Sequence, residues 1–265
     1  MAMLCVMLSL GACATSNTKN TAQTNAGDRP DTLAETNVKL GVGYLQQGRR
    51  DLALSKLQRA LELSPNLASA HNAIAIVYDQ LGQYEEAGQH YQKAVSLAPN
   101  DSNALNNYGT FLCNRNELGK AEQYFLQALE NPLYETPALA YENAGLCATR
   151  VPNTVKAEKY FRSALQINPR LSGSLYQMSV ISFDRGEYLP ARAYLQRYAT
   201  VAKHSPQSLW LGIRIEQMLE DKNAASSYAM QLRSTYPDSQ EARLLLNSEG
   251  LVITQPGASQ SGVGE

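Results

Sequence analysis

Small residues recur along this chain at a nearly constant interval. One series of alanines is spaced by 34, 34 and 36 residues and comprises Ala60, Ala94, Ala128 and Ala164. A second series keeps the same register and comprises Ala53, Ala87, Ala121, Ala157 and Ala191. Between the two series each unit has one large apolar residue, namely Leu57, Tyr91, Phe125, Phe161 or Leu195. A 34-residue period with small and large residues in fixed positions is typical of a repeated helix–turn–helix unit.

The pattern predicts an all-α superhelical solenoid of about six tetratricopeptide repeats. Each unit leaves one apolar face uncovered, and stacking of neighbouring units buries it. The predicted units are 34–67, 68–101, 102–137, 138–171, 172–204 and 205–238. The third unit has two extra residues, which we assign to a longer loop between Asn131 and Pro137. A further helix over 239–247 is expected to cap the open end, so that the solenoid covers 32–247.

Glycine and proline fall at the positions that this unit requires. Where the two helices of a unit cross, a missing β-carbon allows close approach at Gly41, Gly109 and Gly145. Between the helices, Gly48, Gly82 and Gly186 permit the turn. Beyond the second helix, proline stops the chain from continuing as helix at Pro65, Pro99 and Pro169.

The N-terminus carries a second signal. Residues 1–12 are almost wholly apolar and end in Leu10-Gly11-Ala12, directly before Cys13. A small-residue cleavage site before a cysteine is the pattern of a bacterial lipoprotein, and the alternative is an ordinary signal peptide with a chance cysteine. We therefore interpret 1–12 as a signal peptide and 13–31 as a flexible tether lipidated at Cys13. No Lys or Arg precedes the apolar run, so we expect the natural translation start a few codons upstream.

This interpretation predicts the cellular location of the protein. Acyl chains on Cys13 would hold it to a membrane. Residue 14 is alanine, whereas aspartate at that place retains lipoproteins in the inner membrane of many Gram-negative bacteria. We therefore expect a lipid-anchored protein on the periplasmic face of the outer membrane. The last residues, 248–265, are rich in Gly, Ser and Gln and are predicted to be disordered.

Two cysteines remain after Cys5 leaves with the signal peptide and Cys13 is lipidated. Cys113 and Cys147 fall in the first helices of consecutive repeats, which pack side by side, and the periplasm is oxidising. A disulfide between them would close a loop of about 35 residues and contribute roughly 4 kcal/mol in the chain-entropy model. The alternative is two buried free thiols. The Cα separation decides between them, and the sequence does not contain it.

Composition argues against several classes of function. With 23 Lys and Arg against 24 Asp and Glu, the chain has no basic stripe for nucleic acid. Its three histidines, His71, His90 and His204, are far apart in sequence and join no cluster of ligands at metal spacing. Phosphate loops, nucleophile elbows and zinc motifs are also missing from the sequence. We expect no enzyme, no cofactor, no metal and no small-molecule substrate.

The concave surface of such a solenoid is the expected binding site. Five positions of each first helix line it, and the residues that we single out there are Val38, Val42, Leu45, Asn72, Ile76, Asn106 and Thr110. Chaperone-binding repeats place a Lys and Asn carboxylate clamp in these positions, and this chain does not. The predicted groove is apolar with a polar edge, which suits an amphipathic helix or an extended apolar segment. The alternatives are that these side chains pack between helices or are covered by the tether.

Several stretches go beyond the generic repeat and resemble the type IV pilus biogenesis/stability lipoprotein family, PilF/PilW. The most specific are Leu105-Asn106-Asn107-Tyr108-Gly109-Thr110-Phe111-Leu112, Tyr141-Glu142-Asn143-Ala144-Gly145-Leu146-Cys147, Tyr188-Leu189-Pro190-Ala191-Arg192 and Leu209-Trp210-Leu211-Gly212-Ile213-Arg214. The resemblance covers about residues 10–240. The pair Cys113 and Cys147 looks like the paired cysteines of the PilW branch.

The resemblance implies a pilotin with six repeats. Such a lipoprotein helps the secretin of the type IV pilus to reach the outer membrane and to assemble into its ring, and so supports pilus formation, twitching and adhesion. Family knowledge places secretin binding in the early repeats, where Val38, Val42, Leu45 and Ile76 lie. A second hypothesis is a general periplasmic repeat lipoprotein that scaffolds envelope or cell-wall assembly without a secretin partner.

Overall fold

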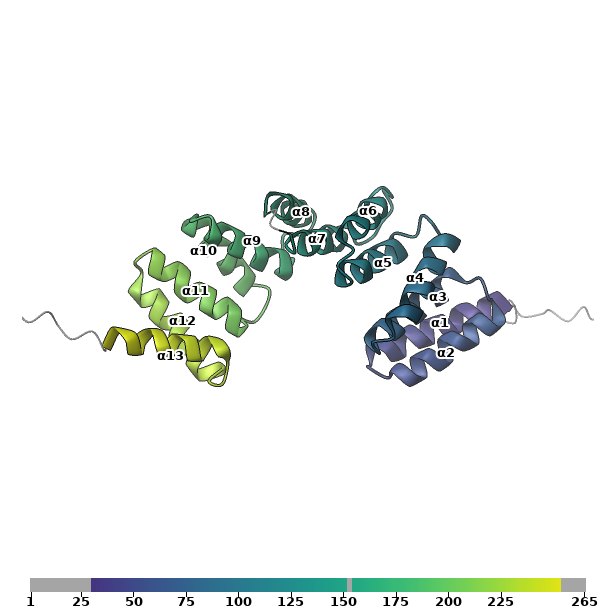
Figure 1. The fold of residues 1–265 in the computed structure, drawn as a ribbon, viewed down its shortest axis with the longest axis horizontal. Coiled ribbons are helices and arrows are strands. Elements are labelled where there is room, and N and C mark those ends of the chain that lie inside the picture. Colours follow the sequence, from purple (N-terminus) through teal and green to yellow (C-terminus); the bar gives the residue numbers. More distant parts are fainter. Residues whose placement is uncertain (1–29, 152–153, 254–265) are drawn as a thin grey trace, which may run out of the picture.

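The structure is a computed structural model that describes residues 30–151 and 154–253. Over these residues the chain forms helices and no strands (Figure 1), which confirms the predicted all-α solenoid. The helices are α1 (Pro30–Gln46), α2 (Arg50–Leu63), α3 (Ala68–Gln80), α4 (Tyr84–Leu97), α5 (Ser102–Asn114), α6 (Leu118–Leu129), α7 (Pro137–Ala148), α8 (Thr154–Ile167), α9 (Ser172–Asp184), α10 (Tyr188–Ala199), α11 (Pro206–Met218), α12 (Lys222–Thr235) and α13 (Gln240–Ile253).

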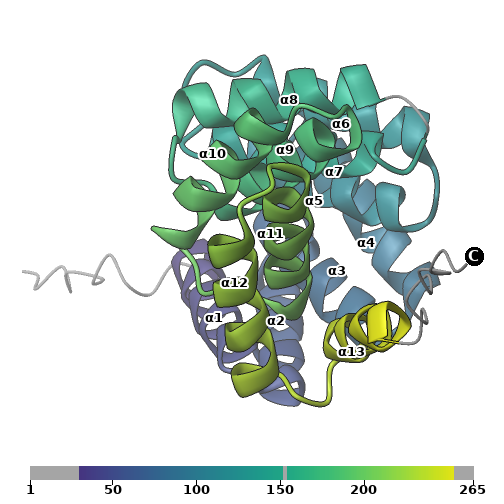
Figure 2. The ribbon, with the colours of Figure 1, turned by 90° about the vertical axis from the view of Figure 1, so that its left-hand side faces the viewer.

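The helices pair in chain order, and the pairs stack into an arch. Figure 1 shows α5, α7 and α9 on the inner side of the arch, with α6, α8 and α10 outside them. Figure 2 views the arch from the end formed by α11–α13. Because the first helix of each pair also contacts the first helix of the next pair, the inner side is one continuous wall of odd-numbered helices.

Tight packing within several pairs depends on the predicted combination of a glycine and a large residue. Phe125 on α6 and Phe161 on α8 are fully buried. A β-carbon on Gly109 would lie 2.8 Å from the Phe125 ring, and one on Gly145 would lie 2.6 Å from the Phe161 ring. Both distances are shorter than a van der Waals contact, so the helices of these pairs cross this closely only because the residue is glycine.

The turns within the repeats also follow the sequence pattern. Gly48, Gly82 and Gly186 have positive φ angles of 74°, 76° and 76°. The third repeat has Asn116 instead, with φ of 63°. Asparagine tolerates the left-handed region better than other non-glycine residues, so this repeat keeps the same turn without glycine.

Two boundaries differ from the sequence prediction. Helix α1 begins at Pro30, inside the predicted tether, because proline suits the first helical position and Asp31 accepts a hydrogen bond from Ser64 at the end of α2. Helix α13 continues to Ile253, beyond the predicted cap end at 247. Its buried residues Ala242 and Leu245 pack on α11 and α12, so α13 covers the end of the stack.

The apolar core is divided along the arch rather than gathered in one centre. The largest cluster of buried residues extends from Ala75 on α3 to Ile181 on α9 and includes Cys113 and Cys147. A separate cluster fills the first repeats, and another lies under α13. This division is expected for a solenoid, in which each repeat contacts only its neighbours.

Candidate functional site

The predicted groove residues of the first repeat separate into buried and accessible positions. Val38 is only 9% exposed and belongs to the cluster that contains Ala70 and Ile74 of α3. The predicted groove position of Val38 is therefore wrong, because the neighbouring repeat covers its side chain. Val42 and Leu45 lie further along α1, pack against the same cluster and remain half-buried. These two residues keep surface that a partner can contact.

Ile76 and Asn72 lie on α3, one helical turn apart. Ile76 is half-buried against the central cluster. Asn72 is half-buried, and its Oδ1 accepts a hydrogen bond from Nδ2 of Asn107 on α5 at 3.3 Å. The second repeat therefore carries a polar and an apolar side chain next to each other, both half-buried.

The same contact recurs one repeat further along the inner wall. Asn106 on α5 accepts a hydrogen bond at its Oδ1 from Nδ2 of Asn143 on α7, at 3.1 Å. Thr110 follows Asn106 by one turn and donates its hydroxyl to the Asn106 carbonyl oxygen at 3.0 Å. We call the pairs Asn72–Asn107 and Asn106–Asn143 the asparagine rungs, because each joins two neighbouring inner helices.

Asn107 and Asn143 were not among the groove residues predicted from the sequence. Each rung joins the fifth residue of one predicted unit to the sixth residue of the next. The sixth residue is not one of the five positions from which the groove was assigned, so the partner on the following repeat was missed. The adjacent Asn106 and Asn107 were the available signal, since each points to a different neighbouring repeat.

Charged groups that border the rungs already have partners. Glu142 on α7 accepts hydrogen bonds from the backbone N–H and the hydroxyl of Ser174, at 2.6 and 2.7 Å. Arg150 donates to the carbonyl oxygen of Cys113 at 2.8 Å and to Oδ1 of Asn114 at 3.2 Å. Glu142 thereby joins α7 to α9, and Arg150 joins the end of α7 to α5. Both charged groups therefore stabilise contacts between neighbouring repeats.

A cleft of about 310 Å³ lies between α5 and α7 beside the second rung. Its lining includes Thr110, Asn143, Leu146 and Arg150. Leu146 is 38% exposed, and Leu139, two turns earlier on α7, is 43% exposed. The inner wall therefore has accessible apolar surface next to hydrogen-bonding amides.

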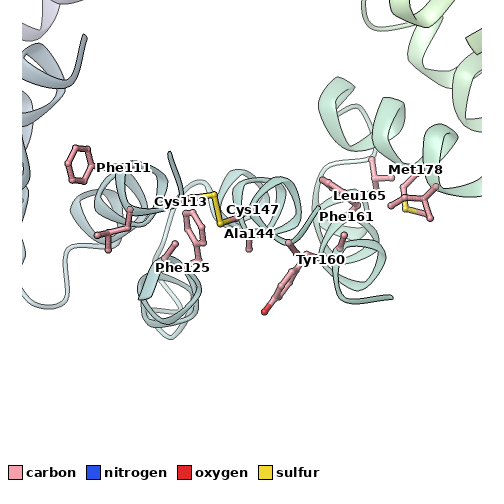
Figure 3. Packing of buried hydrophobic residues seen from close by; sticks show 14 of the residues in the cluster. Phe111, Cys113, Phe125, Ala144, Cys147, Tyr160, Phe161, Leu165 and Met178 are labelled. Carbon is pink, nitrogen blue, oxygen red and sulfur yellow. A yellow bond between two sulfur atoms is a disulfide. The ribbon is translucent and has the colours of Figure 1, made fainter. Parts of the chain in front are cut away.

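Cys113 and Cys147 meet beneath this cleft. In the structure they form a disulfide between α5 and α7, with Cα atoms 5.8 Å apart. Figure 3 shows the bond within the buried core, with Phe125 of α6 beside it. The Cα separation lies in the ordinary range for a disulfide, so the helices need not move to form it. Formation of this bond in the cell stays a prediction.

His71 and His90 form a pair between α3 and α4. Their Nδ1 atoms are 3.0 Å apart, and Nε2 of His71 lies 3.1 Å from the carbonyl oxygen of Pro65. Burial lowers the pKa of His90, and the neighbouring His71 lowers it further. Since the Nε2–H of His71 donates to Pro65, its Nδ1 accepts from His90 when both rings are neutral. His71 therefore joins α4 to the loop before α3.

Other features of the sequence lie at or beyond the limits of the structure. Cys13, the predicted lipidation site, lies outside the described residues. None of the helices in the described ranges has the length and apolarity to cross a bilayer. Within those same ranges, no three His, Cys, Asp or Glu side chains gather as a metal site would require.

An arch of helical pairs with amide and apolar side chains on its inner wall defines a tetratricopeptide-repeat scaffold. Models of the tetratricopeptide repeat match residues 32–100 and 90–123. A solved structure from the functional characterization of Pseudomonas aeruginosa PilF superimposes with a TM-score of 0.78 at 32% identity, over 83% of this chain and 99% of that one. The structure of PilW, described as a widely conserved type IV pilus biogenesis factor, gives a TM-score of 0.73 at 27% identity, over 80% of this chain and 98% of that one.

Sequence comparison narrows the family. The type IV pilus assembly protein PilF of Pseudomonas aeruginosa is 34% identical over 242 residues, which are 91% of this chain and 95% of PilF. An uncharacterized Haemophilus influenzae protein is 40% identical over 117 residues, 44% of this chain and 65% of that protein. The chain belongs to the PilF/PilW family of tetratricopeptide-repeat proteins of type IV pilus biogenesis, as the sequence motifs predicted.

Proposed function

We propose that this protein is an outer-membrane lipoprotein that acts as a pilotin. It binds the secretin of the type IV pilus and promotes its localisation and multimerisation in the outer membrane, and it thereby supports pilus biogenesis and twitching. Its role is binding and not catalysis. The observation that carries the proposal is the similarity to PilF over nearly the full length of both proteins.

The proposed mechanism combines a lipid anchor in the outer membrane with a binding surface for the secretin. The lipid on Cys13 holds the protein at the periplasmic face of the outer membrane. Sixteen residues, 14–29, separate Cys13 from α1 and allow a reach of at most about 60 Å. A secretin subunit bound to the solenoid would therefore stay close to the membrane in which its ring assembles.

The proposed secretin surface begins at the exposed parts of Val42, Leu45 and Ile76. Half-buried aliphatic side chains offer apolar area without loosening the core, because the same residues pack inward. Asn72, Asn106 and Thr110 continue this surface towards the centre of the arch. We also propose that the disulfide between Cys113 and Cys147 forms in the periplasm and fixes α5 against α7 where the surface turns polar.

Two variants test the two halves of the mechanism. Cys13→Ala is expected to leave the helicity of the solenoid unchanged and to move both this protein and the secretin out of the outer-membrane fraction. If the secretin still fractionates with the outer membrane in this variant, the lipid anchor is not needed for secretin localisation and the proposed mechanism is wrong.

Val42→Asp tests the binding half. A carboxylate in an apolar contact loses its hydration, so capture of purified secretin is expected to weaken by about tenfold or more. Val155→Asp is the matched control, because Val155 is 70% exposed on the outer helix α8. Equal secretin capture by the two variants would show that the surface lies elsewhere.

A further inference from the structure

The asparagine rungs leave hydrogen-bonding groups available on the inner wall. Each rung uses the Oδ1 of one asparagine and the Nδ2 of the other. Among the described residues, Nδ2 of Asn72 and of Asn106 and Oδ1 of Asn107 and of Asn143 have no other partner. Each rung therefore offers a donor and an acceptor in a fixed relative position, because the bond within the rung orients both amides.

A donor beside an acceptor is complementary to a peptide group, which carries one N–H and one C=O. The two rungs lie on successive inner helices, and packed helices are about 8–10 Å apart. Three residues of extended chain span about 9–10 Å. A chain of the polyproline II type presents the same face at every third residue. Successive rungs therefore match peptide groups that are three residues apart in one extended segment.

The side chains around the rungs limit the character of that segment. One turn beyond the rungs lie Ile76, Thr110 and Leu146, of which Leu146 is 38% exposed. The neighbouring charges on Glu142 and Arg150 are engaged by Ser174 and by Cys113 and Asn114. The wall thus offers amides and aliphatic surface, which fits an uncharged segment with apolar side chains spaced by three residues.

We propose that the inner wall of α3, α5 and α7 binds an extended, uncharged polypeptide segment of the partner through its backbone, with one peptide group on each asparagine rung. An apolar side chain of the segment occupies the cleft over Leu146. This inference rests on the proposed function, since the partner that it concerns is the secretin. Of the two partner conformations that suit the predicted groove, an amphipathic helix and an extended segment, it selects the extended segment.

The test uses the full-length lipoprotein in detergent and short synthetic peptides that tile the secretin. Asn106→Asp keeps the oxygen that accepts from Asn143 but replaces the available donor by an acceptor. The rung stays formed, while a bound peptide carbonyl loses its partner and faces a carboxylate. Asn72→Asp makes the same change on the other rung. Gln123→Glu is the control, because it adds the same charge at an exposed position on the outer helix α6.

We expect one peptide to bind the wild type, and Asn106→Asp and Asn72→Asp to weaken its binding by about tenfold or more, with unchanged thermal unfolding. Gln123→Glu should bind as the wild type does. N-methylation of two peptide nitrogens three residues apart should abolish binding. Alanine at the same two positions should retain more affinity than N-methylation does, because the rungs contact the backbone.

Three results would overturn the inference. If both aspartate variants bind the peptide as tightly as Gln123→Glu does, the rungs only join the repeats. If no peptide binds although intact secretin is captured, recognition needs a folded surface, and the proposed function stands. If neither peptides nor intact secretin bind, the inference and the proposed function both fail.

Discussion

Loss of the bond between Cys113 and Cys147 should destabilise the centre of the arch by a calculable amount. The two residues are separated by 34 positions, so the bond closes a loop of about 35 residues. In the chain-entropy model, the disulfide lowers the conformational entropy of the unfolded chain by about 13 cal/mol/K. Removing the bond should therefore lower the free energy of unfolding by about 4 kcal/mol at 25 °C. For a domain of this size that corresponds to a fall in Tm of roughly 8–16 °C.

The assay compares the oxidised wild type, the reduced wild type and the double variant Cys113→Ala, Cys147→Ala in urea and in thermal unfolding. Reductant should lower the stability of the wild type and leave that of the variant unchanged. Because each repeat contacts only its neighbours, hydrogen exchange should accelerate chiefly in α5 and α7. The reasoning would be refuted if reduction lowered the free energy of unfolding of the wild type by less than about 1 kcal/mol. Free thiols at Cys113 and Cys147 in protein taken directly from the periplasm would also refute it.

Two further predictions concern the packing within repeats. Gly145→Ala should destabilise by about 1–3 kcal/mol, because its β-carbon would lie 2.6 Å from Phe161, whereas Gly43→Ala, with open space around it, should gain up to about 1 kcal/mol. Urea unfolding measures both, and equal effects would contradict the close-contact argument. The His71–His90 pair should make stability fall as pH drops below about 6.5, because the folded pKa of His90 lies below its unfolded value and the unfolded state then binds more protons. In His90→Gln the fall between about pH 7.5 and pH 5 should be smaller, and an unchanged slope would show that the pair does not cause it.

The sequence predicted those parts of the fold that repeat. Glycine opposite a large apolar residue recurs at Gly41, Gly109 and Gly145, and glycine recurs at the turns at Gly48, Gly82 and Gly186. The roles of Gly109 and Gly48 could therefore be read from spacing alone. The end of α13 could not be read in this way. The Gly, Ser and Gln content of 248–265 predicted that the helix ends at 247, but one glycine, Gly250, costs a helix only about 1 kcal/mol, and α13 continues past it.

The binding surface was less predictable because it depends on contacts between repeats. Val38 and Val42 are one turn apart and chemically identical, yet α3 covers the first and leaves part of the second accessible. The pattern within one repeat contains no information on this coverage, which depends on how the next repeat is rotated. The same rotation brings Asn107 to Asn72 and Asn143 to Asn106.

The central claim is that this protein brings the secretin to its assembled state in the outer membrane. The most direct measurement scores heat- and detergent-resistant secretin multimers on a gel, in outer-membrane fractions from cells with and without the gene. The account predicts that multimers disappear while secretin monomer persists, and that wild-type protein restores them whereas Cys13→Ala does not. Normal multimers without the gene would contradict the pilotin role and favour a periplasmic scaffold or a later step in pilus stability.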